Sequence, residues 1–190
     1  MKTIRKALSL IPPMVLWLML SIFLWGFVFN LLTDAPNAEK ITLCVDAETP
    51  GDTQLAVQLE EMLGGKVRMV KVLPFTYAML DSSTLTNADL FIVPISHAET
   101  YQDWFCPLPE EVKDQDLLLE IGGTAYGIRA YTAADDAGVA KDCIQYTGPN
   151  GIKEDYYLFF GKNSVHIVEN ENAVDNTAVD AARSLFGLYK

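Results

Sequence analysis

The sequence predicts an α/β domain in which helices flank a mainly parallel sheet, with a late antiparallel hairpin, and one transmembrane helix precedes it. Three observations support this prediction. An uncharged apolar stretch runs from Ala7 to Leu32. Strand-like and helical patterns then alternate between residues 41 and 94, as they do in parallel sheets. Finally, ADLFIVP (88–94) contains four large apolar residues in a row, and a strand hidden on both faces is typical of a sheet covered by helices.

The N-terminal apolar stretch is long enough to cross a membrane. A bilayer-spanning helix needs about 20 residues, whereas the apolar core of a signal peptide has roughly 7–15. Three basic residues precede the stretch, and Asp34 and Glu39 follow it, so we expect a cytoplasmic N-terminus. The residues around Thr33 form a poor cleavage site, and no cysteine ends the stretch. We therefore expect an uncleaved cell-membrane signal-anchor (1–32), a linker (33–40) and an extracytoplasmic domain (41–190).

The expected domain is strongly acidic. All 25 acidic residues but only 11 of the 14 basic ones follow the apolar stretch, which gives a formal charge of −14. Nucleic acid is an unsuitable partner for such a surface because its phosphates require a basic footprint. The bilayer is then contacted through the N-terminal helix alone.

The first half of the domain reads as strand, helix, strand, short helix and strand. ITLCVDA (41–47) and VRMVKVLPF (67–75) have the composition of strands. Between them, TQLAVQLEEML (53–63) places Leu55, Leu59, Met62 and Leu63 at helical spacing, and two glycines end this helix. Residues 77–80 predict a short helix before ADLFIVP. This order implies right-handed connections between parallel strands.

The second half has a different pattern. TAYGIRAYT (124–132) predicts a strand. YYLFF (156–160) and SVHIV (164–168) flank the short turn GKN, which favours an antiparallel hairpin. AVDNTAVDAARSLFGLY (173–189) predicts a helix with a stripe of small residues suited to packing on a sheet.

Established catalytic patterns are missing from the sequence. Gly64-Gly65-Lys66 lacks the other residues of a phosphate-binding loop, and the two histidines have no neighbour at metal-ligand spacing. ENEN (169–172) with Asp175 departs from the spacing of known calcium loops. Three cysteines are too few for a disulfide framework, although Cys106 and Cys143 are able to pair if they lie close together. We therefore expect a chain that is not an enzyme and that needs no cofactor or metal.

Several segments in order resemble a known family. KITLCVDAE (40–48), ADLFIVP (88–94) and GGTAYGIRAY (122–131) are similar to the first lobe of the extracellular solute-binding proteins of ABC importers. LFFGKNSVHIVENENAVDNTAVDAARSLFGL (158–188) is similar to the late segment of these proteins. The resemblance implies a periplasmic-binding-protein-like fold and a small solute or a transporter component as partner.

The chain also departs from that family. Its members carry a second lobe, where this chain has only residues 133–152, and Arg129 stands in place of a usual proline. We therefore expect a single-lobe, membrane-anchored, non-catalytic binding domain. The alternative is a protein–protein interaction or scaffolding module on the same fold that has lost solute binding.

Ligands of such folds gather where the parallel strands end. The resemblance and this rule predict a binding surface that contains Asp46, Glu48, His97, Tyr126 and Arg129. Other interpretations remain open. Ser96 with Glu99 has the pattern of a helix capping box, which makes His97 an exposed helix residue. Tyr126 is also typical of a half-buried strand aromatic, and Arg129 of a surface salt bridge.

Overall fold

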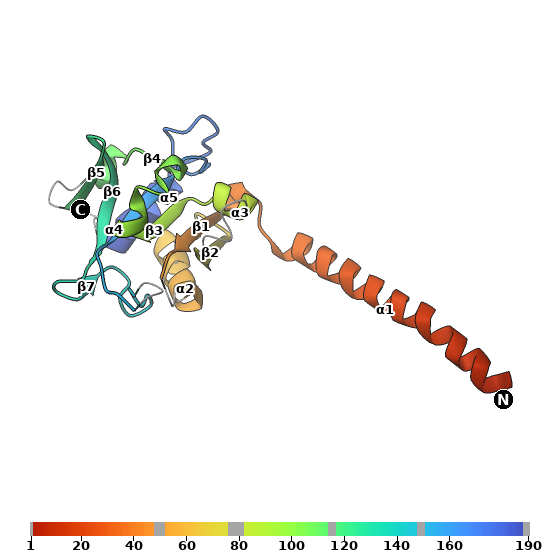
Figure 1. Cartoon of the computed structure of the whole chain (residues 1–190). Coiled ribbons are helices and arrows are strands. Elements are labelled where there is room, and N and C mark those ends of the chain that lie inside the picture. The colour runs from red at the N-terminus through yellow and green to blue at the C-terminus, as the bar shows by residue number, and fades with distance from the viewer. Residues whose placement is uncertain (1, 48–51, 76–81, 114–116, 148–150, 188–190) are drawn as a thin grey trace. The chain divides into compact units, whose positions relative to one another are not determined.

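The chain consists of an N-terminal helix and one α/β domain (Figure 1). The computed structural model describes residues 2–47, 52–75, 82–113, 117–147 and 151–187. The chain divides into two compact units, residues 1–35 and residues 36–190. The helix α1 (Lys2–Thr33) contains an exposed apolar segment, Pro12–Phe29, that is long enough to cross a membrane. Pro12 and Pro13 lie inside this helix rather than in its first turn.

The first half of the domain follows the predicted order. After the 3₁₀ turn η1 (Asn37–Glu39) come β1 (Lys40–Val45), α2 (Asp52–Leu63), β2 (Met69–Pro74), α3 (Ser83–Thr86), β3 (Leu90–Pro94) and α4 (Ile95–Ala98). The strand β1 pairs in parallel with β2 on one side and with β3 on the other. The short helix expected at 77–80 lies outside the described residues.

The second half of the domain is antiparallel. It contains η3 (Gln102–Trp104), β4 (Phe105–Cys106), η4 (Glu110–Val112), β5 (Leu118–Ile121), β6 (Thr124–Thr132), β7 (Ala137–Gly138), β8 (Tyr156–Gly161) and α5 (Thr177–Phe186). The strand order is β2-β1-β3-β8-β6-β5, with β4 on β8 and β7 on β6. Every pair formed by these later strands is antiparallel. The sheet is therefore mixed, and the prediction of a mainly parallel sheet is wrong.

Turn chemistry explains part of this difference. Gly122 and Gly123 both have positive φ angles, of 60° and 82°, between β5 and β6. Two-residue turns of this kind join antiparallel strands directly. No crossover helix is then needed, and the chain returns beside the strand that it has just left.

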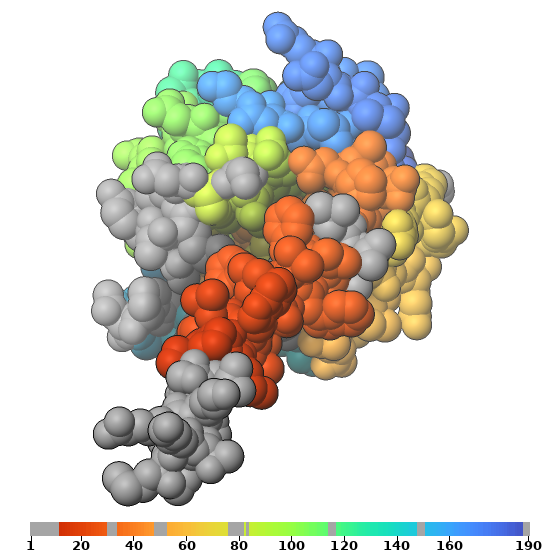
Figure 2. Space-filling model, turned by 90° about the vertical axis from the view of Figure 1, so that its right-hand side faces the viewer, coloured from red at the N-terminus to blue at the C-terminus, as the bar shows by residue number. Residues whose placement is uncertain are grey.

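The late hairpin is absent from the structure. β8 forms as predicted, but residues 164–168 are not a strand. The hydroxyl of Ser164 instead donates to the buried carboxylate of Asp89 at 2.5 Å, and the ring of His166 contacts Asp175 at 2.8 Å. These two contacts hold residues 164–168 against the interior of the domain. In the face shown in Figure 2, the orange residues that begin the domain lie beside this late, blue part of the chain.

Helices cover both faces of the sheet. On one face, leucines of α2 and small residues of α5 pack on β1, β3 and β8. On the other face, α3 and α4 cover an aromatic cluster that contains Phe75, Phe91, Phe105 and Phe159. Leu90, Phe91, Ile92 and Val93 are each at most 1% exposed, as predicted. Full burial of one such side chain contributes roughly 1.5–3 kcal/mol. Met62 is an exception to the predicted helix face, because it is exposed.

Candidate functional site

One edge of the sheet gathers the polar side chains that follow its strands. β1 and β3 are parallel and end at this edge, where β8 begins and β6 ends. Pro94 at the end of β3 lies opposite Tyr156, and Tyr156 lies opposite Tyr131 near the end of β6. We call this region the carboxyl edge, formed by Asp46, Ser96, His97, Tyr131, Glu154 and Tyr156.

Asp46 and His97 form the first part of the carboxyl edge. The Nδ1 atom of His97 lies 2.7 Å from Oδ2 of Asp46, and the backbone N–H of Asp46 donates to the carbonyl of Ile92 at 2.8 Å. The Asp46 side chain is only 12% exposed. Burial raises the pKa of Asp46, the bond to His97 opposes this rise, and the nearby charge of Glu154 adds to it. The pair is positioned to exchange a proton or to bind a hydrogen-bonding group.

Glu154 forms the second part of the edge. Its carboxylate accepts hydrogen bonds from the backbone N–H of Ser96 at 3.1 Å and from the Ser96 hydroxyl at 2.9 Å. Ser96 is therefore not the N-cap of a helix, because α4 begins at Ile95 and Pro94 precedes it. The neighbouring Asp155 accepts a hydrogen bond from the N–H of Ala133 at 2.8 Å. These contacts fix the start of β8 against the ends of β3 and β6.

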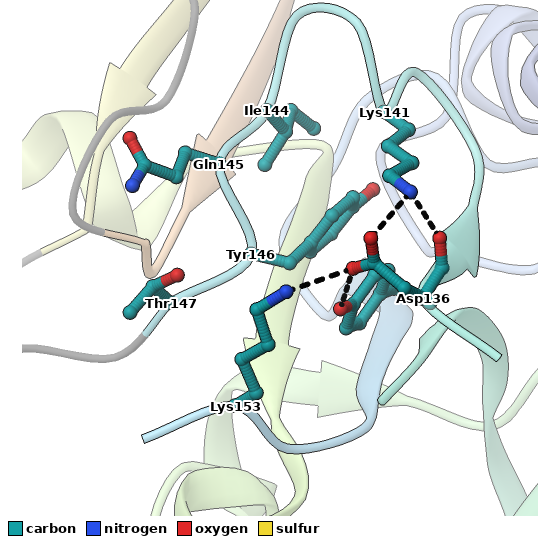
Figure 3. Close-up of a pocket in the computed structure, with 8 residues that line it drawn as sticks. Asp136, Lys141, Ile144, Gln145, Tyr146, Thr147 and Lys153 are labelled. Atoms are coloured by element: carbon teal, nitrogen blue, oxygen red, sulfur yellow. Dashed lines mark hydrogen bonds and ion pairs between the residues drawn. The ribbon is translucent and has the colours of Figure 1, made fainter. Parts of the chain in front are cut away.

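A pocket of about 200 Å³ lies next to Tyr131, near the end of β6 (Figure 3). It is lined by Tyr131, Asp136, Lys141, Ile144, Gln145, Tyr146, Thr147 and Lys153. The rings of Tyr131 and Tyr146 are stacked, with centroids 4.4 Å apart. Most of the lining comes from the segment that follows β6, which folds back over the edge of the sheet.

Asp136 is the hub of the pocket. Its carboxylate accepts hydrogen bonds from Lys141 at 2.7 Å, from Tyr131 at 2.7 Å and from Lys153 at 3.1 Å. The bonds from Lys141, Tyr131 and Lys153 hold the pKa of Asp136 well below its usual range. The hydrogen bond from Tyr131 to Asp136, together with burial, raises the pKa of Tyr131 to about 12. Asp136 stays ionised and Tyr131 stays neutral over the whole physiological range.

Tyr156 lies between the acidic residues of the carboxyl edge and the tyrosines of the pocket. It is fully buried, and its ring packs against Tyr146 with centroids 5.1 Å apart and against Tyr131 at 6.2 Å. Its hydroxyl has no hydrogen-bond partner among the described residues. Burial, followed by the charges of Asp46 and Glu154, raises the pKa of Tyr156 above its usual value. A buried polar group without a partner is uncommon and is often found where water or a ligand binds.

The predicted site residues are only partly brought together. Asp46 and His97 meet at the carboxyl edge, whereas Glu48 lies outside the described residues. Arg129 is half-buried opposite Tyr157, three residues before the end of β6 and therefore about 10 Å from the edge. Tyr126 is six residues from that end, about 20 Å away, and packs on the aromatic cluster. The expectation that Tyr126 lies at the edge is wrong, because the strand runs toward the edge from there.

Sequence reasoning missed most of the pocket. Residues 133–152 were expected only to be too short for a second lobe. Five of the eight lining residues come from Asp136 to Tyr146, and Lys153 follows at the approach to β8. The one available signal was the concentration of charge and tyrosine in KEDYY (153–157) directly before a strand.

The thiols and the remaining acidic groups do not form a further reactive centre in the described part of the chain. Cys44, Cys106 and Cys143 are free. The Sγ atoms of Cys106 and Cys143 contact different groups, the carbonyl of Phe160 and the amide of Gln58. Burial raises the pKa of Cys44 and of Cys106 to about 12, so these thiols are protonated at neutral pH. In the described part of the chain, no group of three His, Cys, Asp or Glu side chains is placed to hold a metal ion.

Comparison with known proteins adds little. No family model matches the chain, and no curated protein matches it. Among solved structures, the chain is similar to thiaminase I from Bacillus thiaminolyticus, with 14% identity and a TM-score of 0.34. The match covers 50% of this chain and 32% of thiaminase I, so it spans about a third of that protein.

This comparison corrects one expectation. The chain was expected not to be an enzyme, and that expectation is contradicted, because the neighbour that was found is an enzyme. A likeness of this extent assigns no activity to the present chain.

Proposed function

We propose that this chain is a membrane-anchored extracytoplasmic binding domain that holds a small polar solute at its carboxyl edge. The observation that carries the proposal is the pocket of about 200 Å³ that includes Tyr131 of the carboxyl edge and is also lined by Lys141 and Lys153. The carboxyl edge also contains the ends of the parallel strands β1 and β3, and ligands of open α/β sheets bind beyond such strand ends. The sequence resemblance to solute-binding proteins of ABC importers supports the same class of function.

The lining suggests the chemistry of the solute. The stacked rings of Tyr131 and Tyr146 provide a flat apolar wall. Lys141 and Lys153 bring two positive charges against the one negative charge of Asp136, in a domain whose overall charge is strongly negative. Their side chains are 47% and 56% exposed, so both remain accessible from solvent. A small solute with an anionic group fits this lining best.

The size of the pocket limits the solute. Ligand pockets for drug-sized molecules have volumes of about 300–1,000 Å³. The present pocket is smaller, at about 200 Å³, and suits either a compact solute or one end of a longer one.

Binding of small anions by the full chain in lipid nanodiscs tests the proposal. Thermal unfolding is measured with carboxylates, phosphates, neutral sugars and amino acids at millimolar concentration. A ligand at 100 times its dissociation constant stabilises the folded state by about 2.7 kcal/mol. Lys153→Gln should weaken binding of the responding solute by about tenfold. Lys66→Gln is the matched control, because Lys66 is 57% exposed and also pairs with an aspartate, Asp180, outside the pocket. Equal effects of the two substitutions would place binding elsewhere.

The alternative function is a protein–protein interaction or scaffolding module. The favouring observation is two exposed isoleucines near the carboxyl edge, Ile95 at 44% and Ile152 at 60%. Exposed apolar side chains beside polar ones are common in protein interfaces. In this case no small solute changes the unfolding temperature, and Ile95→Ser with Ile152→Ser abolishes binding of a transporter component or another membrane protein.

The anchor is part of the proposal and has its own test. Protease added to intact cells should remove the domain and leave a membrane-bound fragment that contains α1. Protection of residues 41–190 from the protease, or a mature protein that begins near Pro36, contradicts an uncleaved anchor with a cytoplasmic N-terminus.

A further inference from the structure

A second histidine lies at the opposite end of the sheet from His97. His166 is fully buried, in the segment that was expected to form a strand. Its ring lies between the residues that begin the domain and the residues that precede α5. Neither the carboxyl edge nor the proposed function makes use of it.

Both ring nitrogens of His166 face acceptors. Nδ1 lies 2.8 Å from Oδ1 of Asp175. Nε2 lies 2.8 Å from the carbonyl oxygen of Asn37 and 3.0 Å from that of Lys40. Carbonyl oxygens never donate, and the carboxylate of Asp175 already accepts the N–H of Thr177 at 2.9 Å. Both nitrogens must therefore carry a proton for all these contacts to be hydrogen bonds, which makes the ring an imidazolium.

The charged groups around the ring favour this state. Asp175 precedes α5, and Asp89 precedes β3 and is linked to the His166 segment through the hydroxyl of Ser164. From the first residues of the domain, Lys40 presents its carbonyl to the ring, and Glu39 pairs with Arg68 at 3.8 Å. Burial opposes the charged ring, but the bond to Asp175, the charge of Asp89 and the bond to Asn37 outweigh it and raise the pKa of His166.

We propose that His166 is a pH-sensitive clasp, which in its imidazolium form fastens the first residues of the domain to the segment that precedes α5. When the ring loses a proton, either Asp175 or the pair of carbonyls faces a nitrogen lone pair. One side of the clasp is then released. The residues concerned on the two sides are Asn37 to Lys40 and Val165 to Thr177.

The backbone contacts around the clasp make its release local. The N–H of Val174 donates to the carbonyl of Val165 at 2.6 Å, and the N–H of Ala178 donates to the carbonyl of His166 at 3.1 Å. The core under β1, β3 and β8 does not depend on the ring proton. Release of the clasp therefore loosens the first residues of the domain, Asn37 to Lys40, while the sheet remains folded.

The protonation state of His166 is tested by nitrogen NMR on the full chain in nanodiscs. The chain has two histidines, so His97→Gln leaves His166 as the sole source of the histidine signal. Both ring nitrogens should be protonated at pH 6, and the ring should titrate above the ordinary value of about 6.5. Asp175→Asn keeps an acceptor oxygen but removes the charge, and it should lower the titration midpoint. A neutral ring at pH 6 overturns the proposal.

The release is tested by hydrogen exchange of the same full chain. Protection factors of residues 36–41 and 165–178 should fall about tenfold, relative to those of β8, as the pH rises through the His166 midpoint. In Asp175→Asn this fall should move to lower pH, and in His166→Gln protection should be low throughout. Parallel profiles in the parent and in Asp175→Asn overturn the proposal, and this comparison holds even if His166→Gln fails to fold.

Discussion

The imidazole of His97 and the carboxylate of Asp46 are joined at 2.7 Å across 51 residues of sequence. The contact forms because β1 and β3 are parallel neighbours, which brings the residues after each strand to one edge. The Asp46 side chain is nearly buried, at 12% exposure, whereas that of His97 is 38% exposed. Asp46 therefore depends on His97 for a hydrogen-bond donor more than His97 depends on Asp46.

This asymmetry predicts the result of a double-mutant cycle. His97→Ala should lower the free energy of unfolding by about 1–2 kcal/mol, because it leaves the Asp46 carboxylate buried without that donor. In an Asp46→Asn background, the same substitution should cost less than about 0.5 kcal/mol. Urea unfolding of the four proteins at pH 7 gives the coupling. Equal costs in the two backgrounds would mean that the pair does not interact in solution.

A buried carboxyl at the other end of the sheet predicts a pH dependence. Asp89 is 3% exposed, and burial raises its pKa to about 6, although hydrogen bonds from Ser164 and Thr42 oppose the rise. A raised pKa favours the protonated carboxyl in the folded state, so its contribution to stability is present below about pH 4 and is lost as the pH rises through about 6. The free energy of unfolding should therefore fall between pH 4 and pH 6.

Asp89→Asn tests the source of this fall. The substitution should remove the slope between pH 4 and pH 6. At pH 4 it should cost less than about 1 kcal/mol, because the protonated carboxyl and the amide each offer one acceptor to the Thr42 N–H and one donor to the Ser164 hydroxyl oxygen. Urea unfolding at pH 4, 5 and 6 measures both effects. An unchanged slope in the variant would assign the pH dependence to other groups.

Gly161 predicts a steric requirement at the end of β8. A Cβ at this position would lie 1.9 Å from the carbonyl oxygen of Ala88, which is backbone and cannot rotate away. Gly161→Ala should therefore cost about 3 kcal/mol of stability, the upper end of the usual cost of overpacking. At Gly127 the nearest atom is the edge of the Phe159 ring at 2.9 Å, so Gly127→Ala should be milder. Thermal unfolding of the two variants checks the order.

Local patterns were sufficient to predict the elements of the first half. Leu90 to Val93 read as a strand buried on both faces, and β3 is that strand. The helix at 53–63 also forms, since its leucine spacing and terminal glycines are properties of the segment itself. The Gly122-Gly123 turn fixes the antiparallel direction of β6 against β5. The direction of the other late strands depends on which earlier strand each segment meets, and no local pattern contains that information.

SVHIV (164–168) shows why the hairpin prediction failed. Its alternation of polar and apolar residues is typical of a strand. The polar members, Ser164 and His166, are nevertheless buried, like Ile167, since their side chains bond Asp89 and Asp175. The partners lie 75 and 9 residues away, so the sequence alone cannot identify them. The pocket was missed for a related reason, because residues 133–147 acquire their place only by folding back on Tyr131 and Tyr156.

Tyr156 predicts a contrast with its neighbour Tyr146. The Tyr146 hydroxyl donates to the carbonyl of Val139 at 2.6 Å, whereas the Tyr156 hydroxyl has no partner in the described part of the chain. Tyr146→Phe should therefore cost about 1 kcal/mol, and Tyr156→Phe should be neutral or stabilise the protein by up to about 1 kcal/mol. Both rings keep their stacking contacts, which makes each variant a control for the other. Urea unfolding without added solute measures the difference. Equal losses in the two variants would show that an ordered water satisfies the Tyr156 hydroxyl in the free protein.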